Sequence, residues 1–273
     1  MQPLTVLTIA GSDSGGGAGI QADLRTFSAF EVHATTAVTA VTAQNTIGVD
    51  SVHNIDPEMV AAQVLSVIED FDVLAVKTGM LAQPATVQKV AELARDGLLP
   101  HLVVDPVLVS STGHPLMDAG GVGAYRDTLL AYAEVVTPNL REAAMLCGVD
   151  VNEVKDHDDM LALARQLLGF GPRWVLVKGG HFAERSLTED RTPDVLVSHG
   201  EVFVFDAERV ATTNDHGTGC SLSAAICAGL ALGRDVPDAA RDAKSFVLAA
   251  LKSAADWKLG RGRGPIDHLG WGS

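Results

Sequence analysis

The sequence predicts an α/β fold in which helices cover both faces of a central, mostly parallel sheet. Short runs rich in Val, Leu and Thr alternate with helical patterns along all 273 residues. Continuous apolar strands of this kind are typical of parallel sheets that are buried on both faces. Hydrophobic residues make up 47% of the chain, and the length fits a single large domain over residues 1–273.

The N-terminal half starts with a strand, because residues 4–9 are apolar and run directly into a glycine-rich loop. A helix is expected at 20–30, and the Thr- and Val-rich stretch 34–43 is expected to be one strand. Asp56 and Pro57 mark the start of a helix that extends to about residue 68, since Asp is a favoured N-cap and Pro fits the first turn. A strand at 73–77, a helix at 84–94 and a strand at 102–105 follow.

The C-terminal half continues the alternation and ends in two helices. The short runs 194–199 and 201–206 predict a hairpin around Gly200. The polar, charged stretch 182–193 is the best candidate for a mobile flap, which we expect to become ordered over a bound nucleotide. The other expected elements are helices at 121–132, 139–147, 158–168, 219–232 and 236–258, and strands at 134–137 and 174–178.

Composition and charge exclude several classes of function. The net charge of −14 argues against a nucleic acid or an anionic membrane as a partner held by general electrostatics. The three cysteines, Cys147, Cys220 and Cys227, lack metal-ligand spacing, and their odd number suits a reduced compartment. Residues 1–10 lack the basic start of a signal peptide. These features predict a cytoplasmic protein without a membrane span.

Loop-forming and functional residues follow five of the expected strands. Ligands of open α/β folds gather at the carboxyl ends of the strands, so these residues are expected to meet at one site. They are Gly11, Gly79-Met80, Asp105-Pro106, Thr137-Pro138-Asn139 and Lys178-Gly179-Gly180.

The loop over residues 11–19 has five glycines but matches neither common nucleotide-binding pattern. No Gly-Lys-Ser/Thr closes it as in a Walker loop, and Ile20 stands where the dinucleotide fingerprint needs glycine. Glycines allow the backbone to approach a ligand closely. A flexible loop that binds no ligand could have the same composition. Asp23, one turn into the next helix, either faces that ligand or lies on the surface.

The stretch Asn214-Asp215-His216-Gly217-Thr218-Gly219-Cys220 opens a helix with two glycines and a threonine. Unpaired N–H groups and the helix dipole favour anion binding at such a start, and the dipole favours the thiolate of a cysteine in the first turn. This pattern predicts transfer of a phosphoryl or acyl group. A glycine-rich turn with a core cysteine is the competing interpretation.

Asn139 and Glu142 share one face of a helix start, and Asp105 lies at a neighbouring strand end. Together they could serve a hydrated Mg²⁺, which takes few protein carboxylates. Asn followed three residues later by Glu is also the capping-box pattern. Lys178 could meet a phosphate, whereas Lys77 and Lys244 are ambiguous. The histidines that flank the candidate loops, His181 and His216, fit turns as well as catalysis.

Eight segments occur together in a fixed order: 10–23, 42–46, 77–81, 105–107, 137–143, 177–181, 216–220 and 262–268. Their combination and spacing resemble the hydroxymethylpyrimidine/phosphomethylpyrimidine kinases of thiamine biosynthesis, nearly from end to end. One departure is the run Ser14-Gly15-Gly16-Gly17, where that family commonly has a serine or proline followed by two glycines.

The resemblance implies a ribokinase-like three-layer α/β/α fold and the use of ATP and Mg²⁺. It implies phosphorylation of 4-amino-5-hydroxymethyl-2-methylpyrimidine, then of its monophosphate, by a protein that is commonly a homodimer. By matching positions, the pyrimidine contacts Gln44, Asp23, Gly11, Met80 and Val107. Mg²⁺ lies near Glu142, Asp105 and Asn139, and the phosphates of ATP lie near Lys178, Thr213 and Lys244.

The implied mechanism places the γ-phosphate of ATP over Gly217, Thr218 and Gly219. Cys220 stands where sugar kinases of this fold carry an Asp base, so its thiolate would accept the proton of the substrate hydroxyl. A pyridoxal or pyridoxine kinase on the same scaffold is the nearest alternative, and Gln44 and Met80 favour the pyrimidine. A non-catalytic small-molecule-binding protein with this fold is a more distant one.

Overall fold

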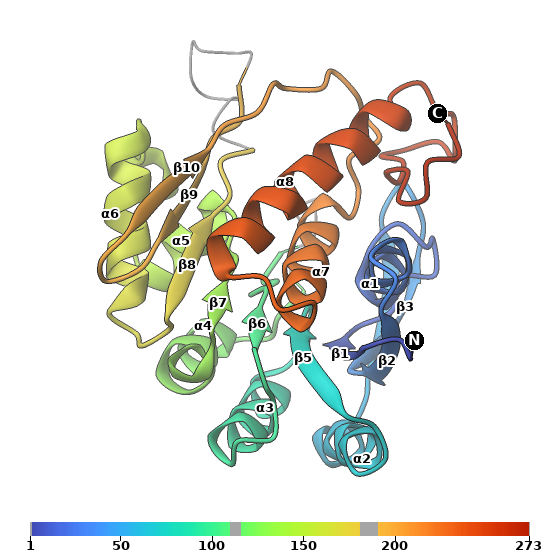
Figure 1. Ribbon diagram of the computed structural model, residues 1–273, viewed down its shortest axis with the longest axis vertical. Coiled ribbons are helices and arrows are strands. Elements are labelled where there is room, and N and C mark those ends of the chain that lie inside the picture. The colour runs from blue at the N-terminus through green and yellow to red at the C-terminus, as the bar shows by residue number, and fades with distance from the viewer. Residues whose placement is uncertain (1, 110–115, 181–190, 273) are drawn as a thin grey trace.

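The computed structural model describes residues 2–109, 116–180 and 191–272. Within these residues an eight-stranded sheet runs through the centre in the order β10-β9-β8-β7-β6-β5-β1-β2 (Figure 1). Six neighbouring strands are parallel, and β9 and β10 continue the sheet as antiparallel strands. The strands are β1 (Thr5–Ala10), β2 (His33–Val38), β5 (Val73–Thr78), β6 (Val103–Val104), β7 (Val135–Val136), β8 (Trp174–Val177), β9 (Asp194–Val197) and β10 (Val202–Phe205).

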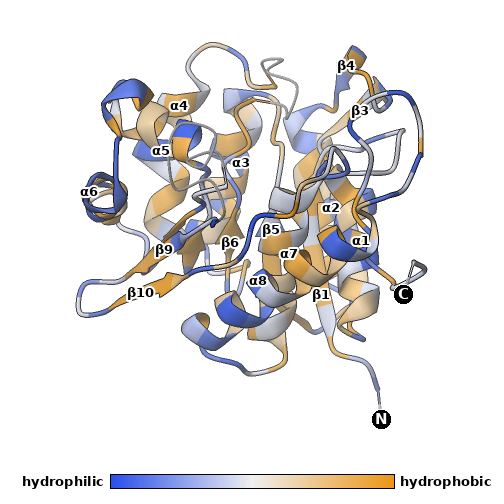
Figure 2. Cartoon of the chain, turned by 90° about the horizontal axis from the view of Figure 1, so that it is seen from above, coloured by the Kyte–Doolittle hydropathy of each residue, from blue (hydrophilic) through white to orange (hydrophobic). Residues whose placement is uncertain are grey.

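Helices cover both faces of this sheet, as the sequence predicts. Successive strand residues point to opposite faces, so Val6 joins the core under α1, α7 and α8, whereas Leu7 joins the core on the other side. Figure 2 shows the apolar residues concentrated on the strands and on the helices beside them. The helices are α1 (Gly19–Ala29), α2 (Pro57–Ile68), α3 (Pro84–Arg95), α4 (Gly121–Ala124), α5 (Leu140–Cys147), α6 (His157–Leu168), α7 (Thr218–Ala231) and α8 (Val236–Ser253).

The order of the strands creates a crevice beside β1. The chain passes from β1 through α1 to β2 on one side, whereas β5 lies on the other side of β1. Connections that leave in opposite directions open a gap at the carboxyl ends of the strands, where ligands of such folds bind. Gly11 follows β1 and Gly79 follows β5, so both glycine turns lie at this crevice.

The stretch 34–43 is two strands, which corrects the expectation of one. The backbone N–H of Thr39 donates to Ala10 O, and its hydroxyl donates to Met80 O at 2.6 Å. These bonds end β2, and the chain then enters β3 (Ala40–Gln44), which pairs with β4 (Val49–Asn54) in a separate two-stranded sheet. The sequence analysis missed β4 because its side chains are largely exposed and lack an apolar alternation.

Two helices differ from their expected extent. The helix expected over 121–132 is α4 followed by a π-helical turn (Tyr125–Leu129) and a 3-10 turn (Leu130–Tyr132). The last helix ends at Ser253, and the Asn214 amide nitrogen donates to the carbonyls of Ala254 and Trp257 just beyond it. These side-chain bonds replace the next helical turn. In the part of the chain that the structure describes, no helix is long and apolar enough to cross a membrane.

Candidate active site

A cavity of about 1380 Å³ opens at the carboxyl ends of the strands. It reaches from the β3–β4 hairpin across the start of α7 to the apolar face of α8. Every residue to which the resemblance assigns a role in the site lines this cavity, with the exception of Asp23. The lining set is Gly11, Gln44, Met80, Val107, Asp105, Asn139, Glu142, Lys178, Thr213, Gly217, Thr218, Gly219, Cys220 and Lys244.

The start of α7 is a candidate anion hole, in which the Thr218 N–H also donates to the Asp215 carbonyl at 3.3 Å. Gly217 is its N-cap, with a left-handed backbone (φ 88°) and no side-chain cap. A Cβ at Gly217 would lie 1.9 Å from the Gly17 carbonyl oxygen, so glycine is needed both for the backbone angle and for the contact between the two glycine loops. N–H groups in the first turn of a helix have no intrahelical acceptor, which leaves them available to an anion in the cavity.

Cys220 lies in the first turn of α7, where it is partly exposed to the cavity. Burial raises the pKa of its thiol to about 11, and the carboxylates of Asp23 and Asp105 act in the same direction against the opposing charge of Lys77. This shift is opposite to the expectation from the helix dipole, because desolvation of the sulfur outweighs the favourable charges. The ligand-free protein therefore holds a neutral thiol at neutral pH.

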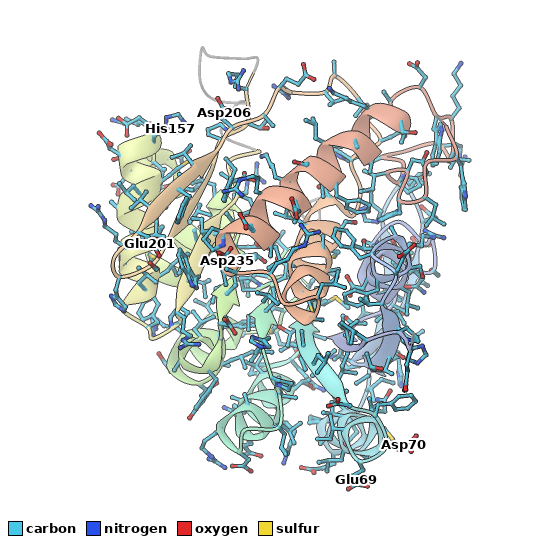
Figure 3. The ribbon with its side chains drawn as sticks, in the orientation of Figure 1. Glu69, Asp70, His157, Glu201, Asp206 and Asp235 are labelled. Atoms are coloured by element: carbon cyan, nitrogen blue, oxygen red, sulfur yellow. The ribbon has the colours of Figure 1, made fainter. Side chains whose placement is uncertain are left out.

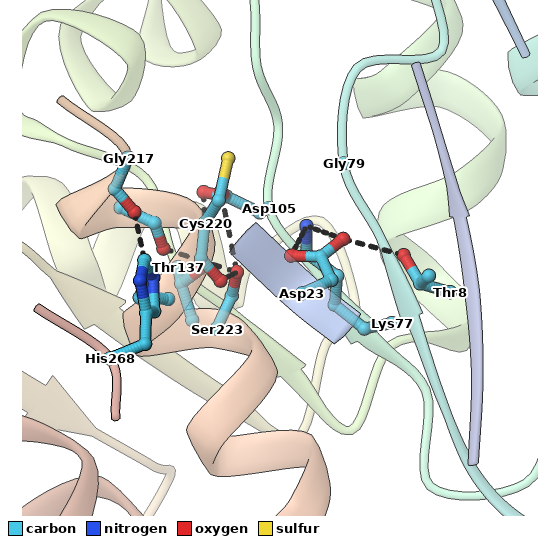
Figure 4. A network of polar contacts seen from close by, with 12 residues as sticks. Thr8, Asp23, Lys77, Gly79, Asp105, Thr137, Gly217, Cys220, Ser223 and His268 are labelled. Atoms are coloured by element: carbon cyan, nitrogen blue, oxygen red, sulfur yellow. Dashed lines mark hydrogen bonds and ion pairs between the residues drawn. The ribbon is translucent and has the colours of Figure 1, made fainter. Parts of the chain in front are cut away.

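An acidic pair with one lysine lies beside the anion hole. The Asp105 carboxylate follows β6, is 1% exposed, and accepts a hydrogen bond from Lys178 Nζ at 2.9 Å. Thr137 and Ser223 donate to the same carboxylate, as Figure 4 shows for these two side chains. Burial and the neighbouring Asp105 raise the pKa of Glu142 to about 7, although Lys178 opposes that shift. One lysine therefore compensates two buried carboxyl groups incompletely.

Asn139 and Glu142 do form a capping box at the start of α5. The Asn139 side chain accepts from the Glu142 N–H, and the Glu142 carboxylate accepts from the Asn139 N–H, each at 2.9 Å. The helix-capping interpretation is confirmed. Glu142 is 3% exposed and lines the cavity, and its carboxylate interacts with the backbone of Leu108 as well as with that of Asn139.

Four of the residues expected at the pyrimidine, Gly11, Gln44, Met80 and Val107, line the cavity. A Cβ at Gly11 would lie 2.2 Å from Met80 Cε, so the glycine lets β1 and the turn after β5 approach each other. The Gln44 amide nitrogen lies 3.3 Å from His216 Nε2, at the turn end of the β3–β4 hairpin. Val107 and Met80 supply apolar surface.

Asp23 does not lie in the cavity wall, which corrects its expected place at the substrate. It is 0% exposed, and both carboxylate oxygens lie 2.9 Å from Lys77 Nζ, with a third bond at 2.6 Å from Thr8 (Figure 4). Burial lowers the pKa of Lys77, but Asp23 and the other nearby negative groups outweigh that effect, so the lysine is charged. The pair is a buried ion pair beneath Cys220.

Lys244 reaches the edge of the cavity from α8. Its ammonium lies 2.8 Å from the Asp194 carboxylate and 2.8 Å from the Thr192 carbonyl. The other oxygen of Asp194 accepts from the Gly179 N–H, so this ion pair fixes the turn after Lys178. Of the expected flap, residues 182–190 lie outside the described residues, as does His181.

Asp13 is an organising residue that the sequence analysis did not select, and its partner His216 is one that the sequence analysis left open between a turn and catalysis. The Asp13 carboxylate is 2% exposed and accepts from the N–H groups of Gly15, Gly17 and Ala18. It also lies 2.8 Å from His216 Nε2, which joins the first glycine loop to the loop before α7. An Asp followed by glycines at two and four residues is the one signal that could have indicated such a turn.

Comparisons with known proteins agree with this geometry. The sequence profile of the family described as phosphomethylpyrimidine kinase matches residues 13–267. The hydroxymethylpyrimidine/phosphomethylpyrimidine kinase of Mycobacterium leprae is 48% identical over 98% of this chain and 94% of its own length. The corresponding Rhizobium meliloti kinase is 46% identical over 96% of both chains.

Solved structures of related kinases have the same fold. The ADP complex of Bacillus subtilis pyridoxal kinase has a TM-score of 0.86 at 36% identity and covers 98% of both chains. The phosphomethylpyrimidine kinase of Clostridium difficile has a TM-score of 0.79 at 35% identity, over 91% of this chain and 99% of that one.

Fold and site together define a small-molecule kinase of the ribokinase-like type. Within that class, the chain belongs to the phosphomethylpyrimidine kinase family.

Proposed function

We propose that this protein transfers the γ-phosphate of ATP to 4-amino-5-hydroxymethyl-2-methylpyrimidine and then phosphorylates the resulting monophosphate to the diphosphate. One observation carries the proposal: the anion hole of α7 faces the acidic pair and Lys178 in the same cavity that Gln44, Met80 and Val107 line. The names of the full-length relatives, up to 48% identical, support this choice of substrate.

Alignment and charge neutralisation account for most of the proposed catalysis. The backbone N–H groups of residues 217–220 receive the oxygens of the transferred phosphoryl group, where charge accumulates in the transition state. Lys178, held by Asp105, adds a positive charge on the side of the acidic pair. The substrate hydroxyl oxygen attacks the γ-phosphorus, the bond to the bridging oxygen breaks, and ADP leaves.

The residues on the acidic side fit a magnesium ion. The buried carboxyl groups of Asp105 and Glu142 lie beside a single ammonium, that of Lys178, in the cavity wall. Glu142 and Asp105 would hold the ion, with Asn139 next to it and water completing the shell. When bound, the ion neutralises charge on the phosphates of ATP.

Cys220 is the proposed base for the substrate hydroxyl. The thiolate becomes the neutral thiol when it accepts the substrate proton, and the thiol must release that proton to solvent before it can act as a base again; its pKa of about 11 makes the neutral thiol the resting form. Only the small thiolate fraction can accept the proton, so the anion hole contributes more than the base to the rate. Asp23 acts on this site only through its ion pair with Lys77, and it does not bind the substrate directly.

ATP is proposed to lie along α8. Leu248 and Leu251 offer an apolar wall for the base, and Thr213 and Lys244 lie toward the phosphate side. Lys244 would exchange its contact with the Thr192 carbonyl for a phosphate oxygen.

Pyridoxal is the second candidate substrate. The structures of the Bacillus subtilis and Staphylococcus aureus pyridoxal kinases have TM-scores of 0.86 with this chain, the latter in complex with AMP-PCP and pyridoxal. The amide of Gln44, which offers both donors and an acceptor, favours an aminopyrimidine edge over the pyridoxal ring.

We also propose that the protein is a homodimer of the cytoplasm, without nucleic-acid or membrane partners. Free, partly accessible cysteines support a reduced compartment, and the charge of −14 argues against polyanions. Light scattering coupled to size exclusion, at several protein concentrations, tests the dimer.

The deciding experiment measures ADP release by the purified protein with Mg·ATP. The hydroxymethylpyrimidine, its monophosphate and pyridoxal are offered in parallel, and ³¹P NMR identifies the products. Turnover of both pyrimidines with poor turnover of pyridoxal is expected. Preference for pyridoxal would overturn the role given to Gln44, and absence of turnover with all three would overturn the kinase proposal.

A further inference from the structure

The segment over residues 260–268, called the C-terminal segment from here on, lies beside the active site without lending it a catalytic side chain. In Figure 1 the end of the chain passes next to the hairpin that contains β3. Its sequence, Gly-Arg-Gly-Arg-Gly-Pro-Ile-Asp-His, contains three alternating glycines. The proposed transfer of phosphate assigns no part to it.

The first part of this segment contacts the β3–β4 hairpin, which carries Gln44. The N–H groups of Arg261 and Gly262 donate to Thr46 Oγ1 at 3.1 and 3.0 Å, and the Arg263 N–H donates to the Thr46 carbonyl at 3.0 Å. Thr46 lies two residues after Gln44. A Cβ at Gly262 would lie 2.0 Å from the Thr46 carbonyl oxygen, so the two backbones are in direct contact.

The middle part holds the loop that leads into the anion hole. Gly264 donates to the Thr213 carbonyl at 3.2 Å and accepts from the His216 N–H at 3.0 Å, which makes a short parallel bridge. The Arg263 guanidinium forms an ion pair with Asp215. A Cβ at Gly264 would lie 2.0 Å from Asn214 Oδ1, so this approach also requires glycine.

The last part reaches beneath α7. His268 is 5% exposed, and its Nε2 lies 2.7 Å from the hydroxyl of Ser221, which is fully buried. The same hydroxyl donates to the Gly217 carbonyl at 2.8 Å. Since Gly217 caps α7, this chain of contacts fixes the peptide group from which the anion hole starts. Asp267 anchors the segment through a bond from its N–H to Ala250 O on α8.

We propose that the C-terminal segment is a positioning element of the active site, which holds the hairpin of Gln44 and the anion hole in register, with His268 fixing the Gly217 carbonyl through Ser221. The inference rests on the proposed phosphoryl transfer. A displacement of about 1 Å can cost on the order of 100-fold in such a reaction, although no catalytic group is lost.

The two ends of the segment are expected to affect different kinetic constants. Thr46→Val removes the hydroxyl that two N–H groups share, and we expect about a tenfold rise in KM for the pyrimidine. Thr46→Ser keeps the hydroxyl and should restore the wild-type KM. His268→Leu should lower kcat on the order of 100-fold at nearly constant KM. His268→Gln, which keeps a polar group near Ser221, should recover most of that loss.

A readout independent of catalysis separates this inference from the proposed function. Hydrogen exchange of the backbone amides at 213–220 should quicken in Gly262→Ala, whose methyl group displaces the segment from Thr46. Gly48→Ala is the matched control in the same hairpin, because nothing lies within 4 Å of its added Cβ. If Gly262→Ala does not fold, Thr46→Val serves in the same comparison.

The outcomes are separable. If the wild-type protein is inactive but hydrogen exchange at 213–220 is faster in Gly262→Ala, only the proposed function is overturned. An active wild-type protein whose Thr46→Val and His268→Leu variants keep kcat and KM within twofold would overturn the inference alone. The inference would also be overturned if each variant changed kcat and KM by equal factors, in proportion to its fall in melting temperature. That result would indicate a merely structural role.

Discussion

The two cysteines on α7, one partly exposed and one buried, differ in what surrounds them. Cys220 faces the cavity in the first turn of the helix, whereas Cys227 is fully buried in the core under α8. Cys220→Ala is expected to lower kcat by about 10²- to 10⁴-fold, the usual contribution of a positioned base. Cys227→Ala should remain within a few-fold of wild type. Steady-state kinetics of both variants test this prediction. If the Cys220 variant is as active as the wild type, Cys220 is not the base.

The raised pKa of Cys220 predicts a pH profile. Below a pKa of about 11 the thiolate fraction rises about tenfold for each pH unit, so kcat/KM should climb between pH 6 and 9. Cys220→Asp introduces a carboxyl group that ionises at much lower pH, and the rising limb should move toward acid. A profile that is flat in the wild type and unchanged in the variant would contradict a thiolate base.

The ion pair of Asp23 and Lys77 predicts a large effect on stability. Asp23→Ala leaves a fully buried ammonium without its carboxylate, which typically costs about 3–5 kcal/mol of unfolding free energy. The double variant Asp23→Leu with Lys77→Met removes both charges and should regain most of that loss. Urea unfolding of the two variants measures the difference, and an equal loss in both would show that packing, not charge, is responsible.

Sequence reasoning predicted which residues would meet in one cavity better than it described their surroundings. Glycines, carboxylates and the lysine at strand ends were found because the fold class fixes where strand ends meet. Asp23 was misplaced because its partner Lys77 is 54 positions away, and no local pattern shows that the pair is buried. Asp13 was passed over because its bonds go to backbone N–H groups of its own loop.

At the scale of elements, α7 and α8 pack unusually closely. A Cβ at Gly229 on α7 would lie 2.9 Å from Ala239 Cβ on α8. Gly229→Ala should therefore destabilise the protein by about 1–3 kcal/mol through overpacking, against the gain that alanine normally brings to a helix interior. Thermal unfolding tests this, with Gly200→Ala as the control, since its added Cβ meets nothing. A stabilised Gly229 variant would contradict the close packing.

Elements with strong local signals were predicted to within a few residues. The helix that Asp56 caps is an example, since its side chain accepts from the Glu58 N–H as expected. The break at Thr39 could not be foreseen, because it depends on hydrogen bonds to Ala10 and Met80 in other strands. The strand β4 lacked any apolar face and is formed by pairing with β3.

The charge of the whole molecule lies mainly on its periphery. Figure 3 labels six exposed side chains, five of them acidic, on the outer ends and turns of helices and strands. The carboxyl groups of Asp105 and Asp194 in the cavity are instead buried and paired with lysines. Nucleotide binding can therefore depend on local donors and a metal ion despite the overall charge of −14.

Ligand binding should stabilise the whole domain in a metal-dependent way. At a concentration 100 times its Kd, a ligand of the native state adds about 2.7 kcal/mol to the unfolding free energy. AMP-PCP with Mg²⁺ is expected to raise the melting temperature more than AMP-PCP with EDTA. Glu142→Gln should reduce that difference. An equal shift with EDTA would argue against a metal ion bridging nucleotide and protein.

The contacts between residues near both ends of the chain bear on how the protein is made. Gly17 packs on Gly217, and His268 lies under the helix that Gly217 caps. Translation at about 5–20 residues per second puts roughly 10–50 s between the synthesis of these regions. During that interval the strands at the N-terminus are present without the last helices that bury them. Nascent chains are thus exposed to aggregation and chaperone binding until the final segment leaves the ribosome.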